Sequence, residues 1–187
     1  SAENAAGWVD GSGNLWMFGG TGYNFSAFQS GRLNMLWKFN PSTSEWTWYK
    51  GDQGVDQVGV YGTQGTPAAG NKPGSRRYAT SWADASGNLW LFGGNGIGAS
   101  GDGALNDLWK YNIASGQWTW MKGDNTVGQA SVYGTVTVFA ATNKPGGREG
   151  STGWIDASGN LWLYGGGNSG TYYSDLWKYN NSTNQWA

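Results

Sequence analysis

The chain has 187 residues, a formal net charge of −1 and charged residues at only 12% of its positions. Neither sign of charge forms a long run, so the sequence indicates no nucleic-acid partner and no anionic membrane surface as a partner. Cysteine and histidine are both absent, which excludes disulfides, zinc–thiolate sites, thiol nucleophiles and the commonest general base. With 34 glycines and 14 tryptophans, the composition favours a compact fold stabilised by aromatic packing.

The composition also bears on location and cofactors. No apolar stretch approaches the ~20 residues that a membrane-spanning helix needs, so we predict no membrane span. A surface covered mainly by glycine, serine, threonine, asparagine and glutamine suits an extracellular or cell-surface setting. We therefore expect a secreted chain that holds no cofactor and no metal.

Internal repetition is the strongest pattern in the sequence. Five tryptophans near the start of the chain recur at an almost constant interval, and four of them recur once more. The three sets are Trp8, Trp16, Trp37, Trp46 and Trp48; Trp82, Trp90, Trp109, Trp118 and Trp120; and Trp154, Trp162, Trp177 and Trp186. A fixed interval of this kind is typical of repeat architectures, so the chain contains three repeats with a period of roughly 72 residues. The third repeat is shorter than the others.

Each repeat begins with an aromatic strand that ends in aspartate and a second strand that is continuously apolar. The strand pairs lie at 7–10 and 15–18, 81–84 and 89–92, and 153–156 and 161–164. A Ser-Gly-Asn turn joins each pair and supplies residues that tolerate the positive φ of a tight hairpin. A continuously apolar strand is typical when both faces are buried, so we expect Trp16, Trp90 and Trp162 to be buried. A glycine pair ends each second strand and permits close backbone approach.

A third strand with the pattern Leu-Trp-Lys-aromatic and a fourth strand with Trp as its second residue complete each repeat. These strands lie at 36–39 and 45–48, 108–111 and 117–120, and 176–179 and 185–187. The sequence thus divides into a first repeat at 1–50, a connector at 51–76, a second repeat at 77–122, a connector at 123–148 and a third repeat at 149–187. We predict no helix longer than a turn or two.

The order of glycine pair, Leu-Trp strand ending in Tyr or Phe, and a tryptophan seven residues further on recurs three times. This order resembles the kelch motif of the galactose-oxidase-like/kelch superfamily, in a Trp- and Gly-rich form. The long connectors make the period longer than the ~50 residues usual for kelch repeats. The resemblance implies one four-stranded blade per repeat of a β-propeller, which normally closes with about 4–8 blades. We therefore expect an all-β chain of three kelch-type blades in an incomplete ring.

Enzymatic activity finds little support in the sequence. The copper site of galactose oxidase uses histidines and a tyrosine cross-linked to cysteine, and this chain has neither histidine nor cysteine. Paired carboxylates for glycoside hydrolysis remain an alternative, but nothing in the sequence fixes two of them opposite each other. The loop carboxylates are Asp52, Asp56, Asp102, Asp107, Asp124 and Asp175. We predict that the chain is not an enzyme.

Binding residues are expected on one face of the molecule. Strand parity places the loops between second and third strands on that face together with the connectors, and loops on a rigid scaffold commonly carry binding residues. The candidates there are Tyr23, Arg32, Tyr172 and Tyr173, with Phe25, Phe28 and Phe139 as further aromatic residues. Tyr61 and Tyr133 lie in matching Val-Tyr-Gly-Thr segments, which favours packing of each connector onto a blade.

Three arginines are further candidates for ligand contact. Arg76 and Arg148 each follow Asn-Lys-Pro-Gly and one small residue, where kelch blades often carry an arginine that could reach a ligand at the centre of the ring. Their recurrence fits equally an interblade salt bridge or a carbonyl contact. Arg77 has Glu149 as its counterpart and is therefore the better candidate for a specific contact.

Three asparagines match the N-glycosylation pattern, namely Asn24, Asn180 and Asn181. Chance matches are the alternative in a chain so rich in asparagine.

Three functions are compatible with these features. The first is an extracellular recognition module that binds a glycan or a protein. The second is a structural subunit that self-assembles into a closed ring or a filament. It would join further copies of itself, or missing blades of a longer chain, through unclosed blade edges. The third is a carbohydrate-active enzyme. Both ends of the chain resemble cuts inside a repeating array, so we expect that a monomer would expose apolar faces.

Overall fold

The computed structural model describes residues 2–26 and 28–187, and this part of the chain consists of strands and loops without a helix. The all-β prediction is therefore confirmed. The strands are β1 (Ala2–Glu3), β2 (Ala6–Val9), β3 (Leu15–Phe18), β4 (Thr21–Tyr23), β5 (Ser30–Arg32), β6 (Leu36–Asn40), β7 (Glu45–Lys50), β8 (Arg76–Arg77), β9 (Thr80–Ala83), β10 (Asn88–Gly98), β11 (Gly101–Asn112), β12 (Gln117–Lys122), β13 (Thr152–Ile155), β14 (Leu161–Tyr164), β15 (Gly167–Asn168), β16 (Thr171–Tyr172), β17 (Leu176–Asn180) and β18 (Gln185–Trp186).

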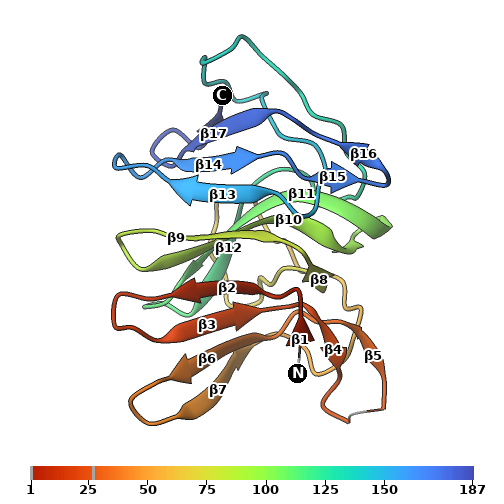
Figure 1. Cartoon of the computed structure of the whole chain (residues 1–187), viewed down its shortest axis with the longest axis vertical. Helices are drawn as coiled ribbons and strands as arrows, with labels where there is room; N and C mark the ends of the chain where they lie inside the picture. Colours follow the sequence, from red (N-terminus) through yellow and green to blue (C-terminus); the bar gives the residue numbers. More distant parts are fainter. Residues whose placement is uncertain (1, 27) are drawn as a thin grey trace.

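The four strands predicted for each repeat form one antiparallel sheet. The sheet orders are β2-β3-β6-β7 in the first repeat, β9-β10-β11-β12 with β8 added against β10 in the second, and β13-β14-β17-β18 in the third. The sheets are stacked along the long axis of the molecule, with β2, β9 and β13 next to one another (Figure 1). Smaller sheets, β1-β4-β5 and β15-β16, lie at the side of the stack that also holds β8.

Aspartate closes the tight turn between the first two strands of each repeat. In the first repeat Asp10 Oδ1 accepts hydrogen bonds from the backbone N–H groups of Ser12 and Asn14, and its Oδ2 accepts one from Trp16 Nε1 at 2.8 Å. The same bonds recur at Asp84 and at Asp156. Each turn thus couples its own geometry to the orientation of the tryptophan that follows it.

The glycine pairs bring neighbouring repeats into contact. Gly93 has φ of +61°, and a Cβ at this position would lie 2.7 Å from the carbonyl oxygen of Arg148 in the next connector. The neighbouring Gly94 N–H donates to the same carbonyl at 2.9 Å. Only glycine combines this backbone conformation with so close an approach, as the sequence predicted.

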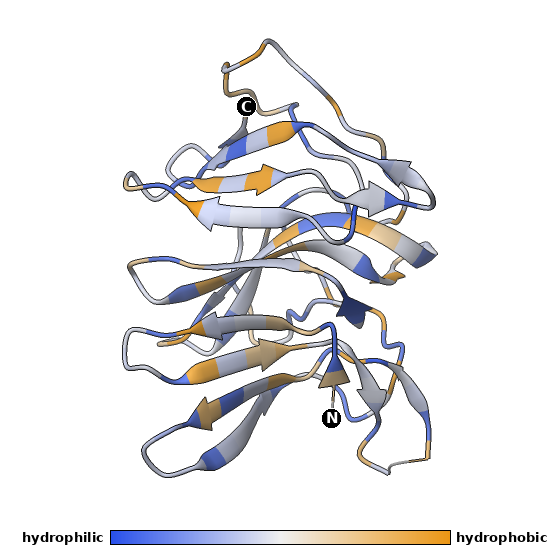
Figure 2. Cartoon of the chain, in the orientation of Figure 1, coloured by the Kyte–Doolittle hydropathy of each residue, from blue (hydrophilic) through white to orange (hydrophobic). Residues whose placement is uncertain are grey.

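The core consists of two apolar clusters, each held between neighbouring sheets. One joins the first sheet to the second, and the other joins the second to the third. Trp16 and Trp90 are buried, as expected, whereas Trp162 is only half-buried. The expectation for Trp162 was wrong because its side of the sheet faces no further repeat in the described residues. Figure 2 shows hydrophobic segments in strands such as β3, β14 and β17.

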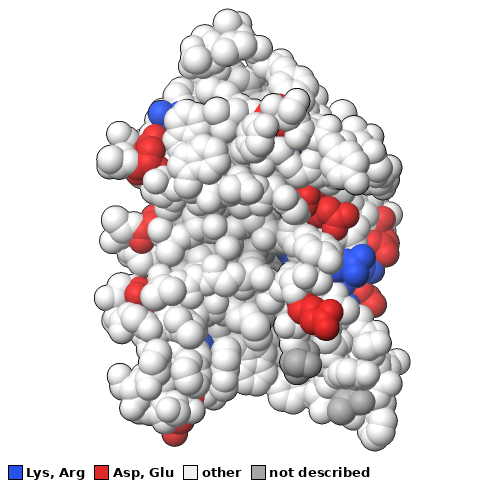
Figure 3. Space-filling view, viewed as in Figure 1, with Lys and Arg blue, Asp and Glu red and all other residues white. Residues whose placement is uncertain are grey.

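The loops divide as strand parity predicts. The tight turns β2–β3, β9–β10 and β13–β14 lie at one side of the molecule, and the β4–β5, β10–β11 and β15–β16 connections lie at the other (Figure 1). Charged groups in the same view gather at these two sides, and most of the surface between them is uncharged (Figure 3).

Candidate functional site

A buried ion pair joins the end of the connector at 51–76 to β11 in the sheet of the second repeat. Arg76 donates from Nη1 and Nη2 to the two carboxylate oxygens of Asp107 at 2.6 and 2.8 Å, and both side chains are at most 1% exposed. The guanidinium also donates to the carbonyl oxygens of Gly74 and Gly93. A buried charge is tolerable only when it is paired and hydrogen-bonded in this way. Burial by itself lowers the pKa of Arg76, but interaction with Asp107 outweighs burial and raises it.

The same carboxylate anchors the connector. Tyr61, from the connector at 51–76, donates its hydroxyl hydrogen to Asp107 Oδ2 at 2.8 Å, and Trp109 Nε1 donates to the same oxygen at 2.7 Å. The Tyr61 ring packs on Trp109 and Trp120. Burial and the nearby carboxylate raise the pKa of Tyr61, so the hydroxyl remains a donor. The connector tyrosine thus packs onto a sheet as predicted, and that sheet is the one that follows it.

The third repeat reproduces this network. Arg148 pairs with both oxygens of Asp175, which also accepts hydrogen bonds from the Tyr133 hydroxyl and Trp177 Nε1, each at 2.8 Å. Burial raises the pKa of Asp175, but these donors outweigh it and lower the pKa below its ordinary value. Arg148 also lies 4.1 Å from the ring centre of Tyr173.

Of the explanations offered for Arg76 and Arg148, the structure therefore supports ion pairs and carbonyl contacts. Each pair fastens the end of a connector to the sheet that follows it, however, and does not join two sheets. Both arginines are 1% exposed, so a ligand at the surface does not reach them.

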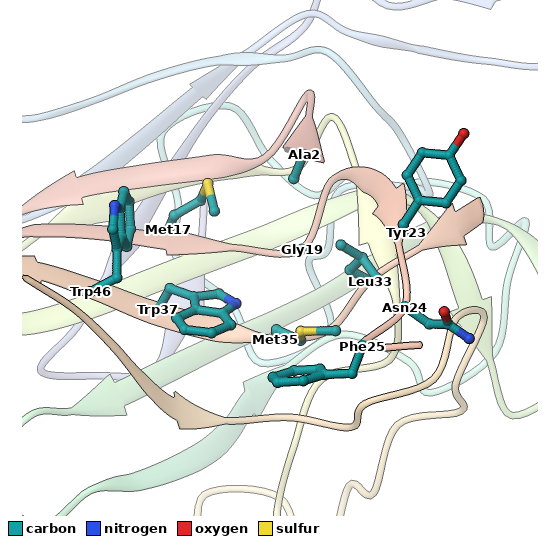
Figure 4. A pocket seen from close by; sticks show the side chains of 10 residues that line it. All are labelled: Ala2, Met17, Gly19, Tyr23, Asn24, Phe25, Leu33, Met35, Trp37 and Trp46. Atoms are coloured by element: carbon teal, nitrogen blue, oxygen red, sulfur yellow. The ribbon is translucent and has the colours of Figure 1, made fainter. Parts of the chain in front are cut away.

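The first repeat lacks the network. Ala2 stands at the position of Arg76, and Met35 stands at the position of Asp107. Phe25, from the loop after β4, packs on Trp37 and Trp48, the counterparts of the two tryptophans beneath Tyr61. A largely apolar cavity of about 540 Å³ lies here (Figure 4), lined by Ala2, Met17, Gly19, Tyr23, Asn24, Phe25, Leu33, Met35, Trp37 and Trp46.

Sequence reasoning missed the partners of the arginines. The signal was present, because Asp-Leu-Trp occurs in the second and third repeats, which have the arginine, while Met-Leu-Trp occurs in the first, which does not. A buried charge needs an opposite charge beside it, so residues of opposite charge that appear and disappear together indicate direct contact.

The loop carboxylates are all ion-paired. Each one lies within 2.8 Å of a cationic side chain. The ion pairs are Lys72–Asp52, Arg32–Asp56, Arg32–Asp102, Arg76–Asp107, Lys144–Asp124 and Arg148–Asp175. A glycosidase needs one carboxyl group held protonated opposite a second one, whereas each of these six carboxylates contacts a cation.

Arg32 and Arg77, two of the predicted binding residues, differ in their contacts, because the buried Nε of Arg77 has no hydrogen-bond partner in the described residues. Arg32 donates to Asp56 at 2.8 Å and, across the repeat boundary, to Asn95 and Asp102. These bonds tie the β4–β5 hairpin to the β10–β11 hairpin. Arg77 is half-buried on β8, with its guanidinium 5.5 Å from the ring centre of Tyr78.

The predicted tyrosines differ in how freely they face solvent. Tyr23 and Tyr172 are 60% and 88% exposed at the ends of β4 and β16. Tyr173 is half-buried against Arg148. Tyr172 and Tyr173 line a shallow cavity of about 470 Å³ together with Glu149, Asn168 and Thr171, among others. The structure thus brings three candidates together at the β15–β16 hairpin, namely Arg148 beneath Tyr173 and Tyr172 beside it, while Tyr23 lies apart in the first repeat.

The three asparagines of the glycosylation pattern have different surroundings. Asn180 Oδ1 accepts hydrogen bonds from the backbone N–H groups of Ser182 and Thr183, which closes a turn. The Asn24 amide donates to the Gln29 side chain. Asn181 is exposed, and it offers the most open amide of the three.

The described part of the chain contains no group of three or more acidic residues placed to hold a metal ion. Nor does any helix in it have the length and apolar character needed to cross a bilayer.

Comparison with known proteins identifies the fold alone. No protein-family model matches the chain, and no curated protein does so either. A solved structure described as "Structure of YjhT" is similar, with a TM-score of 0.61 and 17% sequence identity. The match covers 100% of this chain and 50% of that one, so the chain spans about half the length of this structural neighbour.

Proposed function

We propose that the three repeat sheets are kelch-type blades of a β-propeller and that the chain is a non-enzymatic recognition module, extracellular or at the cell surface. The sequential antiparallel order within each sheet and the stacking of equivalent sheets support the propeller. The Leu-Trp and glycine-pair motifs support the kelch type. As given, the three blades form an incomplete ring.

The observation that carries the recognition function is the contrast between carboxylates and aromatic side chains at the loop-rich side. The six loop carboxylates named above are ion-paired, so these six are not free as a general acid or base. Tyr23, Phe28 and Tyr172 are instead 60%, 90% and 88% exposed. Exposed rings beside uncharged polar groups favour binding over catalysis.

The β15–β16 cavity is the best candidate for ligand contact. Its lining combines the exposed ring of Tyr172 with Asn168, Thr171 and the carboxylate-bearing Glu149. A tyrosine ring can stack against the apolar face of a sugar, while amide and hydroxyl groups hydrogen-bond to its hydroxyls. A neutral glycan fits this chemistry best. The cavity is shallow, so a glycan displayed on a protein would also have access.

Titration calorimetry with a panel of neutral and acidic oligosaccharides tests this proposal. We expect at least one neutral oligosaccharide to bind and Tyr172→Ala to weaken it at least tenfold. Val9→Ala is the matched control, because Val9 is 58% exposed beside the tight turn of β2, on the opposite side. Equal binding by the wild type and Tyr172→Ala would exclude the cavity, and no binding across the panel would exclude glycan recognition.

A further inference from the structure

The two interfaces between repeats are built alike. We define the front face of a repeat as the side that packs on the following repeat, and the back face as the side that packs on the preceding one. The front face of the first repeat and the back face of the second form one buried cluster. Besides Tyr61 of the connector, its members are Ala6, Trp8, Trp16, Phe18 and Leu36 on the front face and Leu89, Leu91, Trp109, Tyr111 and Trp118 on the back face. The second and third repeats meet through equivalent residues.

The front face of the third repeat carries the same residue types, but no repeat covers it in the described residues. Trp154 and Tyr164 are 45% and 49% exposed, whereas their counterparts Trp82 and Phe92 are buried. Leu176 is likewise exposed, although its counterpart Leu108 is buried. This sheet therefore presents an apolar surface with the composition of an interior.

The back face of the first repeat is open in the same way. Trp46 is 52% exposed, whereas its counterparts Trp118 and Trp186 are at most 1% exposed. In those two places the tryptophan packs edge-on against Phe18 or Phe92 of the preceding repeat. Tyr164 of the third repeat is the counterpart of these two phenylalanines. The front face of the third repeat thus has the aromatic ring, and the back face of the first repeat has the tryptophan, of this contact.

Hydrogen bonds across the two internal interfaces follow the same rule. Trp8 Nε1 donates to the carbonyl oxygen of Trp90 at 3.0 Å, and Trp82 Nε1 donates to that of Trp162 at 3.2 Å. By this rule, the indole N–H of Trp154 should donate to the carbonyl oxygen at the position of Trp16 in a further repeat.

We propose that a second copy of the chain covers these faces, with the front face of the third repeat of each copy packed on the back face of the first repeat of the other. The contact continues an interface that the molecule already makes twice. The structural neighbour has as much chain again beyond the matched part, and a second copy would supply the same length of chain. This proposal does not rest on ligand binding.

Phe25 covers the tryptophans of the first repeat from within the repeat itself. In the second repeat Tyr61 reaches in from the preceding connector to cover Trp109 and Trp120. In the first repeat Phe25, from the same repeat, covers the equivalent tryptophans. Because Met35 stands in place of the aspartate, the first repeat has no buried carboxylate at this position that would need an arginine and a tyrosine as hydrogen-bond donors. The back face is therefore suited to a non-covalent neighbour.

Sedimentation velocity of the 187-residue chain at micromolar concentration tests the proposal. We expect a particle of twice the 20.0 kDa chain mass. Trp154→Arg removes the front contact and Trp46→Arg the back contact, and each variant alone should sediment as a single chain. Both positions are about half exposed in one copy, so the fold should tolerate the changes. Phe28→Arg, at a 90% exposed ring on the β4–β5 loop, is the matched control and should keep the double mass.

Mixing the two single variants gives the sharper result. Each retains one intact face, so an equimolar mixture should form a two-chain particle, whereas the double variant should not pair with itself. Near-ultraviolet circular dichroism checks that every variant is folded. A wild type that sediments as a folded single chain would overturn the proposal, as would unchanged mass in both single variants or failure of the mixture to associate.

Discussion

The first and the second repeat each have a pair of equivalent tryptophans that must be covered, and they cover them with different residues. The second buries an Arg76–Asp107 pair and recruits Tyr61 from the connector, while the first uses Ala2, Met35 and Phe25. Both cover the same two tryptophan positions. The ionic version ties a connector to the following sheet through one carboxylate, and the apolar version needs no connector. Replacement of a buried ion pair by apolar residues is often nearly neutral in energy. The two versions therefore differ mainly in whether a connector is held against the following sheet.

Breaking the ionic version should have the largest effect. Asp107→Ala leaves the Arg76 guanidinium buried without a carboxylate, and we expect the free energy of unfolding to fall by about 3–5 kcal/mol. The double variant Arg76→Ala/Asp107→Met copies two of the three differences of the first repeat, because Tyr61 remains, and it should lose clearly less than Asp107→Ala. Chemical denaturation followed by tryptophan fluorescence measures both. A larger loss in the double variant would mean that the apolar version depends on features peculiar to the first repeat.

Removal of the connector hydrogen bond should have a moderate effect. Tyr61→Phe keeps the ring on its two tryptophans, as Phe25 does, but removes one donor from Asp107, and we expect a loss of about 1 kcal/mol. Tyr133→Phe makes the same change where the ring is 62% exposed, and its loss should be smaller. Thermal unfolding of the two variants provides the comparison. Equal losses would contradict the view that burial strengthens the Tyr61 bond.

Lowering the pH should give the smallest difference in the free energy of unfolding between the ionic and the apolar version. Asp175 has a lowered pKa in the folded chain, so its contribution to stability is present above the ordinary aspartate pKa of about 3.9 and is lost as the pH falls through the folded value. The variant Arg148→Ala/Asp175→Met has no titrating group at this position. We expect its free energy of unfolding to fall less steeply than that of the wild type as the pH is lowered below about 4. Parallel pH profiles would show that the pair makes no contribution that depends on protonation.

The sequence determined the local architecture because each strand and turn depends on residues close together in the chain. Alternating and continuous apolar runs indicated the strands, Ser-Gly-Asn indicated the turns, and the spacing of the tryptophans indicated the repeats. The glycine pairs indicated close backbone approach, which Gly93 and Arg148 then make. These features carry over from one repeat to the next because the local chemistry is copied.

Tertiary structure alone decided which copied residues have a partner. Trp162 and Trp90 lie in the same local pattern, yet only Trp90 is fully buried, because burial depends on whether another sheet follows. Arg76 and Arg148 suited ligand contact and structural pairing equally in the sequence. Asp107 and Asp175, which are 31 and 27 positions further along the chain, settled the matter. Long-range pairing depends on how sheets stack, and a local pattern does not encode it.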